Sequence, residues 1–429
     1  MLRKILATAI LAGIACLSSP QTRAQGIVLH DGTPGQNGFS EERLARIDKV
    51  VRQYMDSGWI KGAVGFIAHD GAIVYDKAFG TNNTQTGSRL KTDDIFRIAS
   101  QTKAITSVAV MTLFEEGKFL LDDPISRYIP SFAHPQVLDT FNEKDSSYTT
   151  RPASREITIR DLLTHTSGID YAQIGSPKLR AIYAKAGVEA GFVDRNKLLA
   201  TDIDKLGKLP LAANPGEKFI YSLSVDVLGR LVEVVSKMPL NEYFQKRIFG
   251  PLGMKDTYFD LPASKANRLV ATYTEDPKTH QVIPWGTNTF PGVDINYPLK
   301  KYGYYAGGAG LVSTITDYAI FLQMLLNGGT YNQQRILSRH TVKMMTESQL
   351  GNIPFGDNTF GLGFEVMTEK GSLKLGVSEG SFSWGGFFGT QYWVDPKEKI
   401  VALLFLQQSP LSHGEIQDKF KVLVYQALQ

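Results

Sequence analysis

A serine and a lysine three positions apart are the first residues in this chain whose types and spacing could do chemistry together. Ser100 and Lys103 lie in "FRIASQTKAIT", residues 96–106, at the start of an apolar run. On a helix, side chains at positions i and i+3 share one face and can interact. Burial makes an ammonium group easier to deprotonate, so a buried amine beside the serine could take the serine proton. The pattern predicts an activated serine nucleophile.

The same spacing also has a structural interpretation. Ser100 could cap the helix while Lys103 packs its stem along the apolar surface and extends its charge to solvent. A second copy of the spacing, Ser88 and Lys91 in "GSRLK", lies in a polar stretch with no apolar helix after it. Spacing alone therefore leaves both interpretations of Ser100 and Lys103 open.

A competing serine lies near the other end of the chain. Ser378 is the centre of "GVSEG", which fits G-x-S-x-G, and Asp395 and His413 follow in the order of an α/β-hydrolase triad. That motif needs a strand, a sharp turn and a helix after the serine. The residues that follow, "SFSWGGFFG", predict a strand instead. The pattern therefore favours a turn serine between glycines.

The first residues have the layout of a secretory signal peptide. Arg3 and Lys4 precede an apolar run from Ile5 to Leu17, and cleavage is expected after Ala24. That run is shorter than the roughly 20 residues that span a bilayer. We expect residues 1–24 to be a signal peptide, residues 25–429 to form one hydrolase domain, and the protein to be periplasmic or secreted. A lipoprotein attached through Cys16 is a minor alternative.

Composition excludes several classes of function. Loss of residues 1–24 removes three basic residues and no acidic residue, which takes the formal charge from +4 to +1. Such a balance gives no electrostatic reason to expect nucleic acid or an anionic membrane as partner. Cys16 is the single cysteine and the seven histidines are scattered. We therefore expect neither disulfides nor a metal site.

Hydrophobic periodicity predicts helices at both ends and through the middle of the chain. The predicted helices are an amphipathic helix after Ser40, an apolar one over 98–119, a short one around 161–163, two mostly apolar ones over 221–238 and 313–329, and a closing helix over 414–428. Residues 134–156 are predicted to form a polar loop, and residues 269–305 an irregular segment rich in Pro, Gly and aromatic residues.

Strands are predicted near both termini. Two β-rich runs flank Asp70-Gly71, a strong hairpin signal. The stretches 371–380, 381–396 and 399–408 have the composition of strands. This order predicts an α/β protein of the α+β type: a mixed sheet built from both chain ends, flanked by helices, with an inserted, mainly helical lobe.

Several blocks in one order resemble a known family. These are "FRIASQTK", "ITIRDLLTHTSGI", "NPGEKFIYSLSVDVLG", "IFGPLGMKDTYF", "GGAGLVSTITDYAIF" and "WGGFFGTQYWVDP". The chain resembles serine hydrolases of the β-lactamase and penicillin-binding-protein fold, and particularly class C-type (family VIII) carboxylesterases. The resemblance covers nearly all of the chain after residue 24.

The resemblance implies a role for each matching residue. Ser100 would be the nucleophile, with Lys103 and Tyr221 moving protons. The backbone N–H groups of Ser100 and Phe387 would form the oxyanion hole. His165, in "THTSG", is expected to make a structural hydrogen bond.

Two departures from the family pattern bear on the substrate. Leu223 stands where the second family element, Y-x-N, has asparagine, and Trp384-Gly385-Gly386 stands where K-T-G or H-x-G is usual. The loss of an amide and of a cation favours neutral esters over acidic β-lactams. A blander interpretation of the glycines is close packing of a strand. Residues expected to contact substrate are Trp384, Gly385, Gly386, Leu223 and Tyr305, with Trp285, Tyr302 and Tyr304 as weaker candidates.

We therefore expect an exported serine hydrolase that cleaves short-chain carboxylic esters through an acyl-enzyme, without a cofactor. Its partner would be a small-molecule ester or amide substrate. The alternatives are a β-lactamase or D-amino-acid peptidase of the same fold, or a non-catalytic relative that binds a ligand. The sequence leaves the oligomeric state open.

Overall fold

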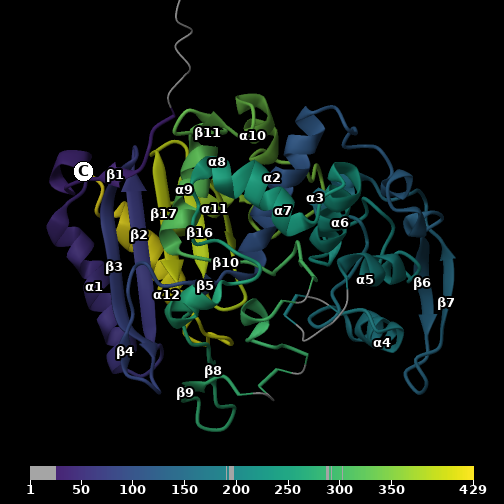
Figure 1. Cartoon of the computed structure of the whole chain (residues 1–429), viewed down its shortest axis with the longest axis horizontal. Coiled ribbons are helices and arrows are strands. Elements are labelled where there is room, and N and C mark those ends of the chain that lie inside the picture. Colours follow the sequence, from purple (N-terminus) through teal and green to yellow (C-terminus); the bar gives the residue numbers. More distant parts are fainter. Residues whose placement is uncertain (1–25, 190, 193–197, 287–288, 291, 302) are drawn as a thin grey trace, which may run out of the picture.

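A mixed sheet formed by both ends of the chain is the centre of the computed structural model (Figure 1). The structure describes residues 26–189, 191–192, 198–286, 289–290, 292–301 and 303–429, so the expected signal peptide and Tyr302 lie outside it. Within these ranges nine strands form the sheet, and β4 pairs only with β3. The order of the others is β1-β3-β2-β17-β16-β15-β14-β13. The bounds are β1 (His30–Asp31), β2 (Gly62–His69), β3 (Ala72–Asn83), β4 (Ser88–Arg89), β13 (Thr359–Phe360), β14 (Glu365–Val366), β15 (Phe382–Gly385), β16 (Gln391–Asp395) and β17 (Ile400–Phe405).

The two chain ends meet where β2 pairs antiparallel with β17, from Ile400 opposite His69 to Phe405 opposite Val64. The Asp70-Gly71 dipeptide closes the β2–β3 hairpin, with His69 opposite Ala72. Both turn residues have positive φ, 48° and 86°, as a two-residue hairpin turn of this hand requires. These pairings confirm the predicted hairpin and the predicted origin of the sheet.

Two helices from opposite chain ends cover one face of the sheet. They are α1 (Glu41–Asp56) and α12 (Glu415–Tyr425), which lie side by side in Figure 1. Ser40 caps α1 as predicted, because its Oγ accepts a hydrogen bond from the Arg43 N–H. Alternate residues of β2, among them Ala63 and Ile67, face this layer.

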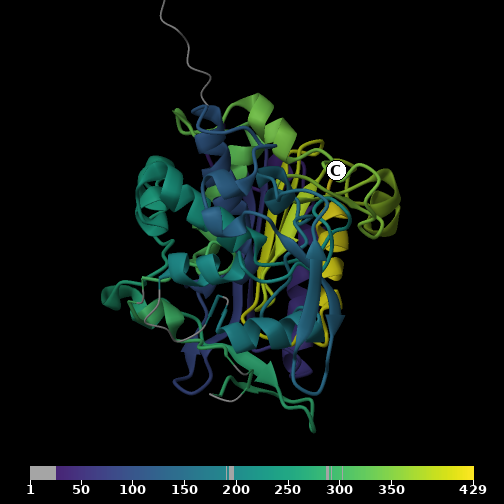
Figure 2. The same cartoon turned by 90° about the vertical axis from the view of Figure 1, so that its right-hand side faces the viewer.

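The opposite face carries α2 (Thr102–Glu115), α9 (Ile315–Leu326) and the helical lobe (Figure 2). The other helices here are α3 (Ile159–Leu163), α4 (Pro177–Ala186), α5 (Leu199–Leu206), α6 (Ser224–Ser236), α7 (Leu240–Phe244), α8 (Gly250–Leu252) and α10 (Arg339–Met345). Val64, Phe66 and Ala68 of β2 face this larger core. Twelve of the fourteen residues of α2 are buried, so it is the central helix of the protein.

The strand predicted over 371–380 is wrong. Its first half forms the helix α11 (Glu369–Leu375), which Thr368 caps by accepting a hydrogen bond from the Gly371 N–H. The alternating Leu373 and Leu375 suggested a strand, but Leu373 is 83% exposed and packs into no core. The alternation of apolar residues in this stretch therefore does not reflect a buried face.

The polar loop predicted over 134–156 is also wrong, because most of it is a hairpin. The two strands are β6 (Gln136–Phe141) and β7 (Tyr148–Pro152). Every residue of β7 is exposed, so no apolar pattern could reveal the strand. Backbone pairing and a 2.7 Å hydrogen bond between the hydroxyls of Thr140 and Thr149 hold it.

Short strand pairs connect the remaining segments. They are β5 (Phe96–Arg97) with β10 (Val312–Ser313), β8 (Tyr273–Glu275) with β9 (Val282–Pro284), and β11 (Thr330–Tyr331) with β12 (Gln334–Arg335). The β8–β9 hairpin lies within the segment expected to be irregular, and most of the other residues that the structure describes in that segment have no regular structure. The β5–β10 pair matters most, since it fixes the chain just before Ser100.

Candidate active site

Ser100 lies in a 3₁₀ turn, η2 (Ala99–Gln101), that leads directly into α2. Its neighbour Ala99 has φ of 45°, in the left-handed region that residues other than glycine rarely adopt. Ala99 and Ile98 are fully buried, and the Ile98 N–H donates a 3.2 Å hydrogen bond to the Leu311 carbonyl. Tertiary packing therefore holds a conformation that costs about 1–3 kcal/mol. The turn leaves Ser100 partly exposed at the head of a buried helix.

Lys103 is buried, with 2% of its surface exposed, so the alternative of a solvent-reaching lysine does not hold. Its Nζ lies 3.2 Å from Ser100 Oγ and donates a 2.6 Å hydrogen bond to the Gly308 carbonyl. The amine also lies over the rings of Tyr221 and Tyr171, 4.6 and 5.5 Å from their centroids. Aromatic faces at this range attract a cation.

Tyr221 reaches the same serine from the residues just before α6. Its hydroxyl donates a 2.6 Å hydrogen bond to Ser100 Oγ. The ring is held by Tyr171 (centroids 5.6 Å apart, stacked), His165 (4.9 Å) and Trp384 (5.5 Å). The structure thus brings together the three residues expected to be catalytic.

Burial sets the protonation of the groups around this cluster. His165 is 1% exposed, and burial together with the charge of Lys103 lowers its pKa well below the usual value. Burial raises the pKa of Tyr171 well above its usual range, with smaller contributions from Tyr221 and Asp226. His165 is therefore a neutral imidazole, and Tyr171 a neutral phenol, across the ordinary working range of pH.

His165 makes the structural hydrogen bond expected of it. Its Nδ1 lies 3.3 Å from Ser222 Oγ, which starts a chain of buried hydroxyls. Ser222 Oγ and Ser224 Oγ are 2.8 Å apart, and so are Ser224 Oγ and Ser167 Oγ. These hydrogen-bonded side chains join the "THTSG" stretch to the "YSLS" stretch that contains Tyr221, and so help to fix the position of Tyr221.

The end of β15 closes the site on the other side of Ser100. A Cβ on Gly386 would lie 2.5 Å from the Ile98 carbonyl oxygen and 2.2 Å from Thr390 Oγ1, so only glycine fits there. At Gly385 the nearest atom to a Cβ would be the Thr390 carbonyl oxygen, 3.3 Å away. The close approach at Gly386 brings the following residue, Phe387, to the pocket that Ser100 lines. Its role as an oxyanion donor remains a prediction.

A narrow pocket opens beside Ser100, and its lining is uncharged among the described residues. The lining consists of Ser100, Tyr171, Gln173, Ile174, Gly191, Phe192, Phe290, Val293 and Phe387. Phe387 contacts both Phe290 and Phe192, with centroids 5.7 and 6.1 Å apart. The wall facing the nucleophile is thus an aromatic, apolar surface.

Other residues expected to contact substrate lie elsewhere. Leu223 is 1% exposed and belongs to the main core, so it offers no surface to a ligand. Tyr305 donates a 3.2 Å hydrogen bond to Asp260 and lines a different cavity. Trp285 is 8% exposed and packs on Phe387 and Phe388, and it is not among the residues that line the pocket beside Ser100.

Tyr304 packs at the edge of the main core. Trp384 is partly exposed and touches the Tyr221 ring, so it remains a candidate for substrate contact.

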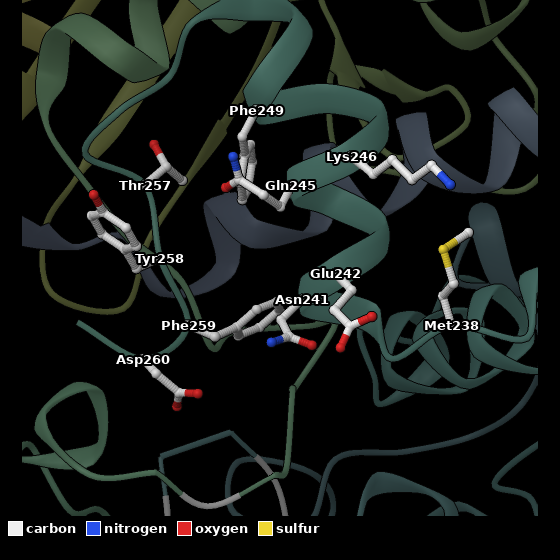
Figure 3. A pocket seen from close by; sticks show the side chains of 10 residues that line it. All are labelled: Met238, Asn241, Glu242, Gln245, Lys246, Phe249, Thr257, Tyr258, Phe259 and Asp260. Carbon is white, nitrogen blue, oxygen red and sulfur yellow. The ribbon is translucent and has the colours of Figure 1, made fainter. Parts of the chain in front are cut away.

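A larger cavity of about 490 Å³ lies over α7 and the segment that follows it (Figure 3). Its lining comprises Met238, Asn241, Glu242, Gln245, Lys246, Phe249, Thr257, Tyr258, Phe259 and Asp260. None of the three residues at the Ser100 cluster belongs to it. Size alone therefore does not mark the reactive cavity in this protein.

The competing triad does not form. Ser378 lies in the turn between α11 and β15, so the strand–turn–helix elbow that its motif needs is absent at this position. The Asp395 carboxylate accepts hydrogen bonds from the Tyr425 hydroxyl at 2.6 Å and from the Lys397 N–H at 2.9 Å. His413 stacks on Trp59 with centroids 3.8 Å apart. Asp395 and His413 are thus engaged in separate structural contacts.

Comparison with known proteins assigns the family. The family model described as Beta-lactamase matches residues 47–426. An Escherichia coli (strain K12) protein provisionally named a D-alanyl-D-alanine carboxypeptidase is 31% identical, over 96% of this chain and 93% of its own. Esterase EstB of Burkholderia gladioli is 27% identical over 84% of this chain and 89% of its own.

A solved structure agrees with these relatives. That of EstCE1, described as a hydrolase with promiscuous acyltransferase activity, superimposes with a TM-score of 0.77 and 26% identity, over 90% of this chain and 99% of that one. In the described part of this chain, no helix is long and apolar enough to cross a membrane. The fold expected from the sequence is therefore confirmed: the chain belongs to the β-lactamase family of serine hydrolases, and it resembles the family VIII carboxylesterases within that fold.

Proposed function

We propose that this protein is a carboxylesterase that cleaves short-chain esters through an acyl-enzyme on Ser100. The observation that carries the proposal is the convergence of Lys103 Nζ, at 3.2 Å, and the Tyr221 hydroxyl, at 2.6 Å, on one serine oxygen. A serine needs such a base and a proton donor to act as a nucleophile and then release the alcohol. That oxygen lies at an apolar pocket which suits an uncharged acyl group.

The reaction has two halves. Ser100 Oγ attacks the ester carbonyl as its proton passes to the Lys103–Tyr221 pair, and the N–H groups of Ser100 and Phe387 bind the oxyanion. Collapse of the tetrahedral intermediate breaks the bond to the alcohol oxygen, which takes the proton from the pair. Water then attacks the acyl-enzyme as one of its protons passes to the same pair. The bond between the acyl carbon and Ser100 Oγ breaks, Oγ takes that proton from the pair, and the acid is released.

The surroundings of the cluster favour neutral esters over carboxylate-bearing substrates. A β-lactam or a peptide C-terminus carries a carboxylate that needs a cation, and the described lining of the pocket offers none. Trp384 stands where the family pattern has a lysine or histidine. A D-amino-acid peptidase, as the name of the Escherichia coli relative suggests, is the runner-up.

Three substrates separate these candidates. We expect hydrolysis of p-nitrophenyl butyrate at a kcat/KM at least about a hundredfold above that for a chromogenic cephalosporin or for a D-alanyl-D-alanine peptide, a gap of about 3 kcal/mol. The Ser100→Ala variant should lose the ester activity. Faster turnover of the cephalosporin or the peptide would replace our assignment by that of a β-lactamase or a peptidase.

We also propose that the protein is exported, and that residues 25–429 form the mature hydrolase domain. The basic start, the short apolar run and the small residue Ala24 support cleavage after position 24. Expressed in a Gram-negative host, the protein should be recovered from the periplasm with Gln25 as its first residue by N-terminal sequencing. A cytoplasmic protein that retains its first residues would disprove export.

A further inference from the structure

The glycine-rich segment 306–310 is packed between α2 and α6, behind Lys103. Thr106 Oγ1 donates a 2.7 Å hydrogen bond to the Gly307 carbonyl, which fixes the segment to α2. On the other side, a Cβ on Gly307 would lie 2.7 Å from the Val225 carbonyl oxygen of α6. The segment therefore has little freedom to move relative to either helix.

The Gly308 peptide links Lys103 to a buried carboxylate. Its carbonyl accepts the 2.6 Å hydrogen bond from Lys103 Nζ, and its N–H donates a 3.3 Å hydrogen bond to Asp226 Oδ1. A Cβ at Gly308 would lie 2.4 Å from Asp226 Oδ2 and 3.4 Å from Lys103 Nζ. One small space thus separates the carboxylate from the amine, and the absence of a side chain at Gly308 keeps them near each other.

Asp226 is 1% exposed, so its charge is poorly screened by solvent. Its position in the first turn of α6 would also suit an ordinary helix-dipole interaction. That interaction needs no contact with Gly308, however, and does not account for the hydrogen bond that Asp226 accepts from the Gly308 N–H. A buried carboxylate near an amine favours the charged form of the amine.

We propose that Asp226 is a positioning residue for the reaction: it holds the Lys103 amine against Ser100 through the Gly308 peptide, and it stabilises the ammonium that forms when the serine proton leaves. This inference rests on the proposed function. In the step concerned, the O–H bond of Ser100 breaks and an N–H bond forms on Lys103 Nζ. The freed oxygen electron pair bonds to the substrate carbonyl carbon, and the π pair of that carbonyl moves onto its oxygen. Asp226 balances the new positive charge without touching the substrate.

Other titratable groups also face this amine, and the experiment must separate their effects from that of Asp226. They are Tyr221 ahead of α6, and Tyr171 and His165 in the segment after α3. Asp226 is the carboxylate among these groups. Its replacement by asparagine removes a negative charge, which the loss of the neutral His165 or Tyr171 would not do.

The test is the pH profile of kcat/KM for p-nitrophenyl butyrate with the Asp226→Asn variant of the full chain. Without the carboxylate, Lys103 loses its proton more easily, so the acidic limb should move to lower pH by about 1 to 3 units while kcat falls. Asp226→Glu keeps the charge and should return the limb toward its original position. Asp202→Asn is the matched control, because Asp202 is a buried carboxylate on α5 that lies 4.0 Å from Lys205 Nζ.

An acidic limb that stays in place in Asp226→Asn, or that moves equally in Asp202→Asn, would overturn the inference. The concentration of active enzyme is measured at each pH with a fluorophosphonate probe, so that partial unfolding is not mistaken for a shift of the acidic limb. If Asp226→Asn does not fold, Gly308→Ala is the second variant, because its methyl group separates the Asp226 carboxylate from the Lys103 amine and leaves every charge in place. An acidic limb that does not move in Gly308→Ala would also overturn the inference. A failure of the proposed function is distinct, because Ser100→Ala would then retain ester hydrolysis.

Discussion

The Tyr221 hydroxyl donates a 2.6 Å hydrogen bond to Ser100 Oγ across 121 positions of sequence. The two residues belong to different structural units: Ser100 to the turn before α2, and Tyr221 to the segment before α6. The packing of α2 against α6 therefore sets the geometry of the site.

Removal of the Tyr221 hydroxyl should reduce the rate more than it affects substrate binding. Tyr221→Phe keeps the ring contacts with Tyr171, His165 and Trp384, but it removes the group that moves a proton. We expect kcat for p-nitrophenyl butyrate to fall by about 10²- to 10⁴-fold with a much smaller change in KM. Tyr128→Phe, whose hydroxyl bonds to the Lys118 carbonyl, is the control. A kcat within a few-fold of the parent would rule out the role of Tyr221.

The glycine pair at the end of β15 offers a matched comparison. Gly386→Ala would place a methyl group 2.5 Å from the Ile98 carbonyl oxygen, whereas Gly385→Ala meets its nearest atom at 3.3 Å. The first variant should displace the Phe387 N–H from the oxyanion, with a loss of about 10²- to 10³-fold in kcat and a lower Tm. Gly385→Ala should lower kcat and Tm far less than Gly386→Ala does. Equal kcat values in the two variants would argue against an oxyanion donor at Phe387.

The aromatic wall should limit the length of the acyl chain. Phe290 contacts Phe387 and lines the pocket, so Phe290→Ala should enlarge it. Across p-nitrophenyl esters from acetate to decanoate, the preferred chain should lengthen, since each added methylene contributes about 0.8 kcal/mol when buried. Phe355→Ala removes a ring that packs on Phe219 and Phe360 and is the control. An unchanged chain-length profile would remove Phe290 from the acyl site.

The buried neutral His165 should make stability depend on pH. Because its pKa is lowered in the folded state, the unfolded chain binds the proton more tightly below about pH 6.5. The free energy of unfolding should therefore fall as pH decreases below 6.5, with this residue contributing up to about 1.4 kcal/mol per pH unit. Above that pH its contribution is constant.

Urea unfolding between pH 5 and 8 measures this dependence. Below pH 6.5, the free energy of unfolding of His165→Asn should change less steeply with pH than that of the parent, by up to about 1.4 kcal/mol per pH unit. His340→Asn, at an exposed position on α10, controls for the loss of a histidine as such. Parallel curves for the parent and His165→Asn would show that His165 titrates alike in the folded and unfolded chain.

Local signals predicted much of the fold because tertiary packing agrees with them. The Ser40 cap and the Asp70-Gly71 turn are set by hydrogen bonds and φ angles within a few residues, so the sequence suffices. The helix α11 and the β6–β7 hairpin were missed for the opposite reason. Their residues are largely exposed, so the sequence has no pattern of buried apolar residues there from which to predict a helix or a strand.

The site could be predicted where a residue acts through its own type, as with Ser100, Lys103 and Tyr221. The sequence could not predict the contributions of backbone groups, or of contacts between residues that are distant in the chain. Asp226 lies in "YSLSVD" and Gly308 in "GGAG", and nothing in either stretch shows that they meet at Lys103. Leu223 was misplaced because alignment with a motif gives a position in the chain but not the direction of a side chain.

Covalent labelling by a fluorophosphonate, mapped by mass spectrometry, tests the central claim most directly. Trypsin should release residues 98–103, which contain Ser100, and residues 375–397, which contain Ser378. The account predicts one adduct per chain on the first peptide, and none in Ser100→Ala. An adduct on the second peptide, or undiminished labelling of Ser100→Ala, would contradict it.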